Sequence, residues 1–261
     1  MSQNVIFENV SKTFPGRRGA AANTVIAGFS GEVAVNEFLC LLGPSGCGKS
    51  TVLNMVAGFA KPTSGRISVG GRLVRGPGPD RGIVFQQYAL FPWYSVARNV
   101  ELGLEAKAVP RAERRETVER MLRAVGLWAH RDKYPKELSG GMKQRAAIAR
   151  TLAADPEVIL MDEPFAALDA QTREHLQQEL LSIWEGSRKT VIFVTHSVQE
   201  AALLADRVTI LGRNQGQVIA SLPSPLSRPR NRMDDDVIAF EREIYAWLKQ
   251  AEATGVDAEA A

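Results

Sequence analysis

The chain of 261 residues contains only two cysteines and no long hydrophobic run. Cys40 and Cys47 are too few for a disulfide framework, so we expect a reduced, cytoplasmic setting. The longest apolar stretches, such as "FLCLL" and "VILM", fall far short of the ~20 residues that cross a bilayer. The opening "MSQNVIFENV" lacks a basic start followed by an apolar run, so we expect no signal peptide. Work at a membrane would need another protein to span it.

A strong net charge is also absent, because 32 Lys and Arg residues stand against 29 Asp and Glu residues. The formal charge of +3 comes without a basic block, which argues against nucleic acid as a partner. The composition, 45% hydrophobic, is that of an ordinary globular protein with enough residues to bury a sizeable core.

β-rich and helical patterns alternate along the chain. The pieces "VIFENVSKTF", "GEVAVNEFLCLLG", "RISVGGRLV" and "RGIVFQQ" predict strands of a mixed sheet, with "PGRRGAAANT" as a surface turn and "STVLNMVAGF" as a helix. From Ala89 to Leu152 helix formers and charges prevail, and Pro110 can open a helix at its first turn. We therefore expect a helical subdomain over residues 89–152, inserted into a core of residues 1–88 and 153–225.

The second half of that core, residues 153–225, has the sequence pattern of a parallel sheet. The near-continuous apolar runs "EVILMD" and "TVIFVTH" are typical of parallel strands covered on both faces, and "DAQTREHLQQELLSIWE" between them has the length of a crossover helix. This order predicts an α/β architecture. Residues 226–261 follow as the end of an extended connector, "LPSPLSRPRNR", then a helix, "DDDVIAFEREIYAWLKQ", and a frayed tail.

A phosphate-binding loop, "GPSGCGKST", lies between the strand "FLCLL" and the next helix. Its glycines let backbone N–H groups turn toward phosphates at the positive end of that helix. Lys49 would neutralise the β- and γ-phosphates, and Ser50 would bind Mg²⁺. The alternative is a chance glycine-rich turn, which the strand-loop-helix setting disfavours. The predicted nucleotide-binding residues here are Gly43, Pro44, Ser45, Gly46, Cys47, Gly48, Lys49, Ser50 and Thr51.

Two carboxylates follow the apolar strand in "VILMDEP". Asp162 would reach the carboxyl end of the sheet, where ligands of open α/β sheets bind, and hold Mg²⁺ directly or through water. Glu163 points to the other side of the backbone and could orient or deprotonate the water that attacks the γ-phosphate. Neighbouring carboxylates are usually a solvated turn. Their place after a buried strand, in a chain with a phosphate loop, favours the catalytic interpretation.

Two further polar residues, His196 and Gln86, lie at the ends of predicted strands. His196 follows "TVIFVT" and could hydrogen-bond the γ-phosphate or the attacking water, although packing is an equal alternative for a lone histidine. Gln86 closes "GIVFQ" just before the helical insert, where a neutral amide can contact Mg²⁺ or water. His130 and His175 are interpreted as surface or structural residues.

Two local features have open alternatives. The aromatics Phe91, Trp93 and Tyr94 in "YALFPWYSVARNV" are either core residues or a surface that receives a partner. Cys47, in the phosphate loop at a helix N-terminus, is either a thiol whose thiolate form is favoured or a small residue that fits.

A second stretch, "KELSGGMKQR", also places a serine and two glycines ahead of basic residues and an apolar run. With it, the motifs over residues 4 to 220 resemble those of the nucleotide-binding subunit of ABC transporters. The matching motifs, in order, are the phosphate loop, "VFQQ", "LSGGMKQR", "VILMDEP", "AALD" and "VTH". Joint occurrence in this order is far more specific than any single motif.

The resemblance implies a P-loop NTPase (RecA-like) core with an N-terminal antiparallel β subdomain and the helical insert, an ABC ATPase domain over residues 1–225, and ATP and Mg²⁺ at its site. It also implies a head-to-tail cassette dimer, a homodimer for this chain, in which the LSGG signature closes over the partner's ATP. The residues carried over on this ground are Ser139, Gly140, Gly141, Asp169 of the "AALD" loop, and Phe14 as an adenine-stacking residue where tyrosine is commoner.

Within the family, the chain resembles the short importer ATPases for nitrate, sulfonates, taurine and related solutes. We therefore expect membrane permease subunits that dock near Tyr88–Tyr94, an indirectly coupled solute-binding protein, and a place on the cytoplasmic face of the membrane. The alternatives are an exporter cassette, a soluble ABC ATPase acting on DNA or ribosomes, and a nucleotide-dependent binding module without turnover. The long coiled coils or second cassette of the soluble class are absent from this sequence.

Overall fold

The computed structural model describes residues 3–16, 21–166 and 168–253, apart from the side chain of Ser187. Contacts divide the chain into two compact units, Met1–Gly78 with Thr190–Ala261, and Pro79–Lys189. Residues 17–20 of the predicted surface turn and the tail from residue 254, predicted to fray, lie outside the described residues.

The first unit begins with an antiparallel sheet in the order β2-β1-β4-β5. Val5, Phe7 and Val10 of β1 are buried, with a register shift between Phe7 and Val10 that breaks the strict alternation. The Phe7 ring meets the Phe29 ring edge-on, with 4.9 Å between ring centroids. One expectation is corrected, because "GEVAVNEFLCLLG" is not one strand but the end of β2, a turn and β3. The strands of this sheet are β1 (Val5–Phe14), β2 (Asn23–Val33), β4 (Ser64–Val69) and β5 (Arg72–Leu73).

A second set of strands in this unit is centred on β3, which pairs in parallel with β8 and β9, while β9 pairs antiparallel with β10. Every residue of β3 and β8 is buried, which explains their unbroken apolar sequences. Sequence reasoning missed β9 and β10. The elements are β3 (Phe38–Leu42), β8 (Thr190–Val194), β9 (Arg207–Leu211), β10 (Val218–Pro223), and the helices α1 (Lys49–Ala57), α6 (Val198–Leu204) and α7 (Asp235–Ala253).

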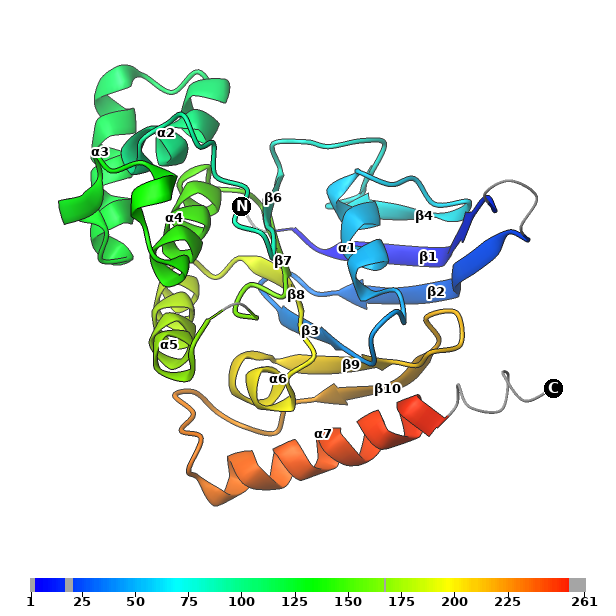
Figure 1. Cartoon of the computed structure of the whole chain (residues 1–261). Coiled ribbons are helices and arrows are strands. Elements are labelled where there is room, and N and C mark those ends of the chain that lie inside the picture. The colour runs from blue at the N-terminus through cyan, green and yellow to red at the C-terminus, as the bar shows by residue number, and fades with distance from the viewer. Residues whose placement is uncertain (1–2, 17–20, 167, 254–261) are drawn as a thin grey trace. The chain divides into compact units, whose positions relative to one another are not determined.

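Helix α7 packs on α6, β9 and β10 (Figure 1). Two arginines of the connector before it fix the C-terminal end of α6. Arg230 Nη1 donates to the carbonyls of Ala202 and Ala205, both at 2.8 Å, and Arg228 Nη2 donates to the carbonyl of Leu204 at 2.5 Å. Cations at this end of a helix satisfy its unpaired carbonyl groups and oppose its dipole. Burial lowers the pKa of Arg230 to about 10, because the guanidinium is partly removed from water.

We expect Arg230→Gln to lower the free energy of unfolding by about 1–2 kcal/mol, because charged hydrogen bonds to half-buried carbonyls are lost and solvent screens part of the effect. Urea denaturation followed by circular dichroism measures the change. Arg242→Gln, on the exposed side of α7, is the matched control and should stay within about 0.5 kcal/mol of wild type. Equal effects of the two substitutions would contradict a capping role.

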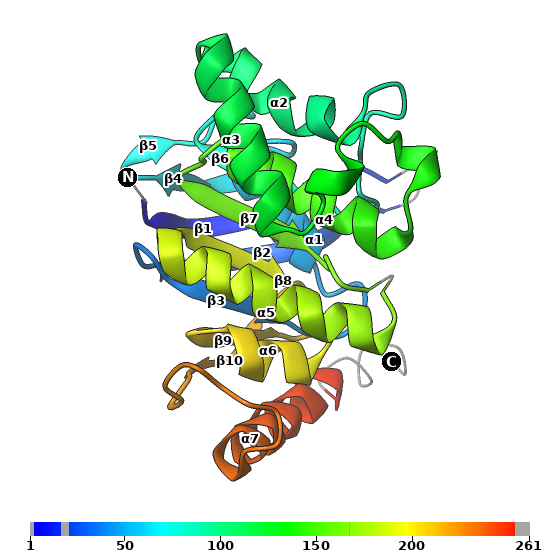
Figure 2. The same ribbon diagram turned by 90° about the vertical axis from the view of Figure 1, so that its left-hand side faces the viewer.

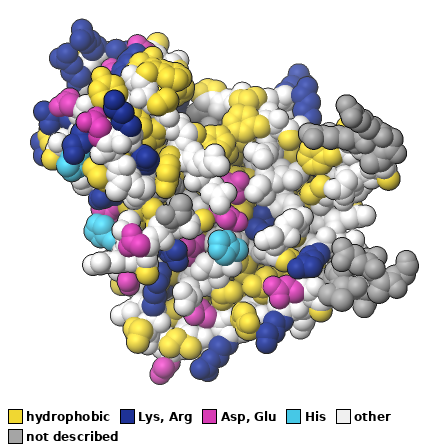
Figure 3. Space-filling view, in the orientation of Figure 1, with side chains coloured by type: hydrophobic (Ala, Val, Ile, Leu, Met, Phe, Trp, Pro, Cys, Tyr) yellow, Lys and Arg dark blue, Asp and Glu magenta, His cyan; other side chains and the backbone are white. Residues whose placement is uncertain are grey.

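The second unit contains the parallel pair β6–β7 and the helices α2 to α5. Helices α2, α3 and α4 pack together (Figure 2) around a core that includes Val100, Leu122 and Ala149. Lys and Arg side chains gather over α2 and α3 on the face drawn in Figure 3. The elements are β6 (Arg81–Val84), α2 (Val96–Ala106), α3 (Arg111–Ala124), short 3-10 turns at Trp128–His130 and Pro135–Glu137, α4 (Gly140–Ala153), β7 (Val158–Asp162) and α5 (Ala170–Ser187).

The inserted helices are confirmed, and α3 begins directly after Pro110 as the sequence predicts. The compact unit is longer than the predicted insert, because it also includes β6, β7 and α5. The boundaries 89–152 for the helical subdomain, and the division at residue 225, stay predictions.

Candidate nucleotide-binding site

The phosphate loop of the first unit joins β3 to α1 and has a backbone that requires glycine. Gly43, Gly46 and Gly48 have φ of 156°, 80° and 100°. A Cβ on Gly43 would lie 2.4 Å from the carbonyl oxygen of Leu211, and one on Gly48 would lie 2.5 Å from Ile26 Cδ1. The glycine spacing therefore follows from a left-handed backbone and from close packing against β9 and β2.

Lys49, the first residue of α1, is only 6% exposed. Its Nζ donates to the carbonyl oxygens of Gly43 at 2.7 Å and Pro44 at 2.9 Å, within its own loop. No carboxylate pairs with this ammonium among the described residues. A buried cation that has only neutral acceptors is costly, so the loop is suited to an anion such as a phosphate group.

Cys47 lies in the same loop, 1% exposed, with its Sγ 3.8 Å from Lys49 Nζ. Burial raises the pKa of the Cys47 thiol, and this outweighs the opposite effect of Lys49. The hypothesis of a favoured thiolate is therefore wrong, and Cys47 is a small buried residue of the loop.

His196 lies two residues past the end of β8. Because β3 and β8 are parallel, with Leu41 opposite Val194, the phosphate loop and His196 leave neighbouring strands at the same edge. The His196 side chain is exposed, while the chain beside it is held by the Thr195 hydroxyl, which donates to Glu200 at 2.6 Å and accepts from the Ser197 N–H at 3.0 Å.

Phe14 ends β1 with its ring 42% exposed and Lys12 Nζ 4.9 Å from the ring centroid. It pairs with Asn23 of β2, the strand whose Val25 and Ile26 touch the phosphate loop at Gly48. The structure thus places an open aromatic ring on the same strand pair that meets the phosphate loop.

The second unit brings Gln86 and Glu163 together. Gln86 Nε2 lies 3.4 Å from Glu163 Oε2, and Asp162 ends β7, the strand paired with β6. Glu163 has φ of 43°, a left-handed conformation uncommon for a residue with a side chain and often found where strain serves function. Among the described residues, no cluster of three or more His, Cys, Asp or Glu side chains could hold a metal ion by itself.

The LSGG signature forms the start of α4. Ser139 is its N-cap, and its Oγ accepts from the Met142 N–H at 3.3 Å. Asp169 caps α5 in the same way, accepting from the Thr172 N–H at 3.0 Å, and this bond lowers the pKa of the Asp169 carboxyl. The two helix starts meet, because a Cβ on Gly141 would lie 2.6 Å from Thr172 Cγ2.

The aromatic segment is not core, since Phe91 is 40% and Trp93 65% exposed. Fully buried Asn99 holds the backbone of this segment: its Oδ1 accepts from the Phe91 N–H at 2.8 Å and its Nδ2 donates to the Tyr94 carbonyl at 3.1 Å. A groove of about 470 Å³ lies alongside, lined by residues 86–90 together with Pro135 and Lys143.

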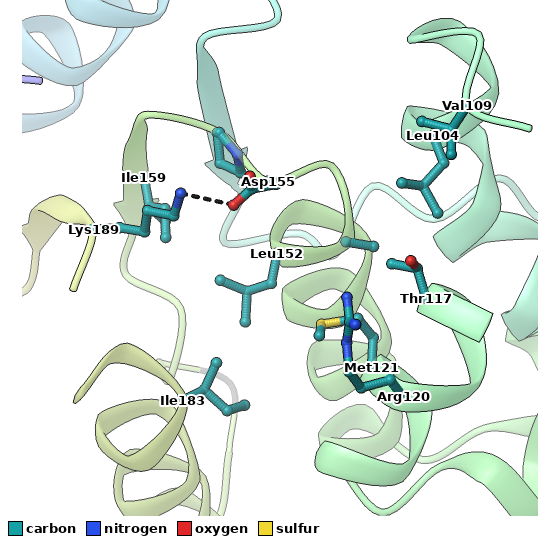
Figure 4. Close-up of a pocket in the computed structure, with 12 residues that line it drawn as sticks. Leu104, Val109, Thr117, Arg120, Met121, Leu152, Asp155, Ile159, Ile183 and Lys189 are labelled. Atoms are coloured by element: carbon teal, nitrogen blue, oxygen red, sulfur yellow. Dashed lines mark ion pairs between the residues drawn. The ribbon is translucent and has the colours of Figure 1, made fainter. Parts of the chain in front are cut away.

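A separate cavity of about 380 Å³ opens between the helices of this unit (Figure 4). Leu152, Met121 and Ile183 line it, and the Lys189–Asp155 ion pair, 2.7 Å between Nζ and Oδ1, lies at its side. None of the predicted site residues lines this cavity, so its size does not mark the nucleotide site.

Comparison with known proteins identifies the family. A family model described as "ABC transporter" matches residues 26–166. A nitrate import ATP-binding protein, NrtD, of Synechocystis sp. is 42% identical over 96% of this chain and 97% of that protein. A bicarbonate transport ATP-binding protein, CmpD, of the same organism is 48% identical over 92% of this chain and 86% of that protein. This chain belongs to the ABC transporter family.

Solved structures agree with this assignment of the cassette. A dimeric structure of the ATP-binding cassette MJ0796, described as a post-hydrolysis state bound to ADP and Pi, superposes with a TM-score of 0.76 at 33% identity, covering 85% of this chain and all of that chain. The predicted P-loop NTPase fold and the assignment as an ABC-type ATPase are confirmed, as is the resemblance to the nitrate importer group. No described helix of the cassette is long and apolar enough to cross a membrane.

The predicted site residues of the cassette fall into two sets, one in each compact unit. Phe14, the phosphate loop and His196 belong to the first unit, and Gln86, the two carboxylates, the signature and Asp169 belong to the second. Sequence reasoning missed Arg150, which contacts the backbone just after Gln86. Its signal was a single arginine in the alanine-rich run "AAIARTLAA".

Proposed function

We propose that this cassette hydrolyses Mg·ATP in a homodimer and thereby drives the import of a small inorganic oxyanion, nitrate or bicarbonate, through membrane permease subunits. The observation that carries the nucleotide chemistry is the buried Lys49 ammonium, which has only uncharged acceptors among the described residues. The choice of import and of solute rests on NrtD and CmpD, whose names state nitrate and bicarbonate and which align with almost the whole chain.

At the phosphate end, Lys49 would exchange its two loop carbonyls for phosphate oxygens, which are better acceptors for a buried cation. The N–H groups of the loop and the first turn of α1 would surround the same phosphates. The exposed ring of Phe14 would stack on adenine, and the cation–π contact from Lys12 leaves one ring face for this purpose.

For hydrolysis, a water molecule attacks the γ-phosphorus, Glu163 accepts its proton, and the bond to the β-phosphate oxygen breaks to leave ADP and phosphate. Gln86 would orient Glu163 and the water through its amide. His196 would donate to the γ-phosphate from the edge at which the phosphate loop begins. Ser50 and Asp162 would supply oxygen ligands for Mg²⁺, which would neutralise part of the phosphate charge.

The signature would act on the nucleotide of the other cassette. Ser139 is exposed at the start of a 14-residue helix whose first N–H groups have no intrahelical acceptor, and Gly140 and Gly141 leave those groups uncovered. Such a helix start is suited to a γ-phosphate brought by a partner. Asp169, at the adjoining start of α5, would face the same dimer interface.

The permease would dock on the exposed aromatic segment Phe91–Tyr94 and the groove of residues 86–90 beside it. Exposed aromatic side chains on a backbone fixed by a buried asparagine suit a protein interface, because little conformational freedom is lost on binding. This docking would place the cassette on the cytoplasmic face of the membrane. A solute-binding protein would act on it only through the permease.

The proposal is tested by reconstituting the chain with its permease and solute-binding protein in liposomes. We expect nitrate or bicarbonate, and neither taurine nor an alkanesulfonate, to stimulate ATP hydrolysis and to accumulate on the side of the membrane that carries the cassette. Phosphate release and isotope uptake are the measurements. Stimulation by taurine or an alkanesulfonate instead would correct the solute, and ATP-driven transport away from the cassette side would contradict import.

A further inference from the structure

The turn after Gln86 has a strained backbone. Ala89 has φ of 47°, in the left-handed region, and its N–H donates to the carbonyl of Gln87, which closes a tight turn around Tyr88. A residue with a Cβ keeps such a conformation only when its surroundings impose it.

Arg150 of α4 imposes it. Its Nη1 donates to the carbonyl of Ala89 at 2.6 Å and its Nη2 to the carbonyl of Tyr88 at 3.2 Å. No carboxylate pairs with Arg150 among the described residues, and burial lowers the pKa of its guanidinium. The hydrogen bonds of the Arg150 guanidinium therefore go to the carbonyls of Tyr88 and Ala89. The planar guanidinium, which donates to both carbonyls, fixes their relative orientation.

The same turn also reaches the other end of α4. A Cβ on Gly140 would lie 3.0 Å from Tyr88 Oη, so the Tyr88 side chain lies beside the first residue of the helix. Gly140 and Arg150 are ten residues apart, about 15 Å along one rigid helix. Movement of the turn is thus mechanically tied to movement of the signature at Ser139.

Helix α4 also carries a buried polar side chain without a hydrogen-bond partner. Gln144 is 0% exposed, and neither its Nε2 nor its Oε1 has a hydrogen-bond partner among the described residues. A buried amide without a partner is costly. The Tyr88–Ala89 turn and helix α4 therefore each carry an unfavourable local feature.

We propose that Arg150 is a positioning residue that ties the Tyr88–Ala89 turn to the signature helix, so that a permease segment bound in the adjoining groove moves Ser139. The inference rests on the proposed function for its partner. Residues 86–90 form one wall of the groove and Lys143 of α4 another, so an occupant contacts both parts that Arg150 joins. Loss of the guanidinium would leave both parts folded but independent.

The first test uses the full chain alone and does not depend on the solute. Hydrogen exchange is measured with and without Mg·ATP in wild type, Arg150→Gln and Arg150→Lys. We expect ATP to protect residues 139–142 in all three, and residues 87–90 in wild type and, in part, in Arg150→Lys. Arg150→Gln should lose protection of residues 87–90 alone. Equal protection of both segments in Arg150→Gln would overturn the proposal.

The second test uses the reconstituted transporter. Arg150→Gln should keep basal hydrolysis and permease binding within about threefold of wild type, while stimulation by loaded solute-binding protein falls about tenfold, the size expected when one coupling residue is lost. Arg114→Gln, which removes another half-buried arginine of this unit, is the matched control and should keep full stimulation. Parallel loss of basal and stimulated rates without rescue by Arg150→Lys would show a merely structural role.

Failure of the proposed transport function can be distinguished from failure of the positioning role of Arg150. If wild-type transporter shows no solute stimulation while the exchange experiment still separates Arg150→Gln from wild type, then the transport assignment fails and the positioning role stands.

Discussion

Replacing Glu163 with glutamine is expected to reduce steady-state ATP hydrolysis by at least about 100-fold, the lower limit for removal of a general base. Glutamine has the size of glutamate and can keep the contact with Gln86, now 3.4 Å from Gln86 Nε2 to Glu163 Oε2, but it cannot take a proton from water. ATP binding should stay within about twofold of wild type, because the phosphate loop lies in the other unit. Phosphate release and fluorescent-nucleotide titration separate the two effects.

The matched control is Glu157→Gln, the same substitution just before the opposite end of β7. It should leave hydrolysis within about twofold of wild type, since the amino end of a parallel strand faces away from the ligand edge. Because Glu163 has a left-handed backbone, the thermal unfolding of both variants should be compared with wild type. Normal hydrolysis by a well-folded Glu163→Gln variant would show that the general base has been assigned wrongly.

Local chemistry explains what the sequence predicted well. The glycines of the phosphate loop are constrained by their own turn, so residue type and spacing reveal them. The buried strands β3, β7 and β8 were visible for the same reason, as unbroken apolar runs.

Features that depend on tertiary packing were not predictable in this way. Strand β2 contains Asn23, Gly28 and Gly31, which read as turn residues, yet its pairing along β1 makes it a strand of 11 residues. The thiol of Cys47 looked activated because a helix N-terminus lies next to it, but its burial decides its pKa. The partners of Arg150 are backbone carbonyls, which every residue has and no sequence pattern marks.

Ser139→Arg is expected to abolish dimer-dependent hydrolysis, by about 100-fold or more, while ATP binding to the isolated chain stays within about twofold of wild type. The long cation would stand where the γ-phosphate of the partner's nucleotide must approach, and the small N-cap that leaves the first N–H groups of α4 open would be lost. Hydrolysis is measured over a range of protein concentrations, because the wild-type rate per cassette should rise as dimers form. ATP-driven dimers should be detected by size-exclusion chromatography in the Glu163→Gln background and be lost when Ser139→Arg is added.

Loss of a helix cap alone costs about 1 kcal/mol, so a second variant must separate destabilisation from a lost interface. Ser95→Arg removes the N-cap of α2, whose Oγ accepts from the Arg98 N–H at 3.2 Å, and should lower stability to a similar degree while hydrolysis by the isolated chain persists. If Ser139→Arg hydrolyses ATP like wild type, or if the wild-type rate per cassette is independent of concentration, then the signature does not act on a neighbour's nucleotide. If both arginine variants lose activity together, the cause is folding of the helical region and not the missing contact to phosphate.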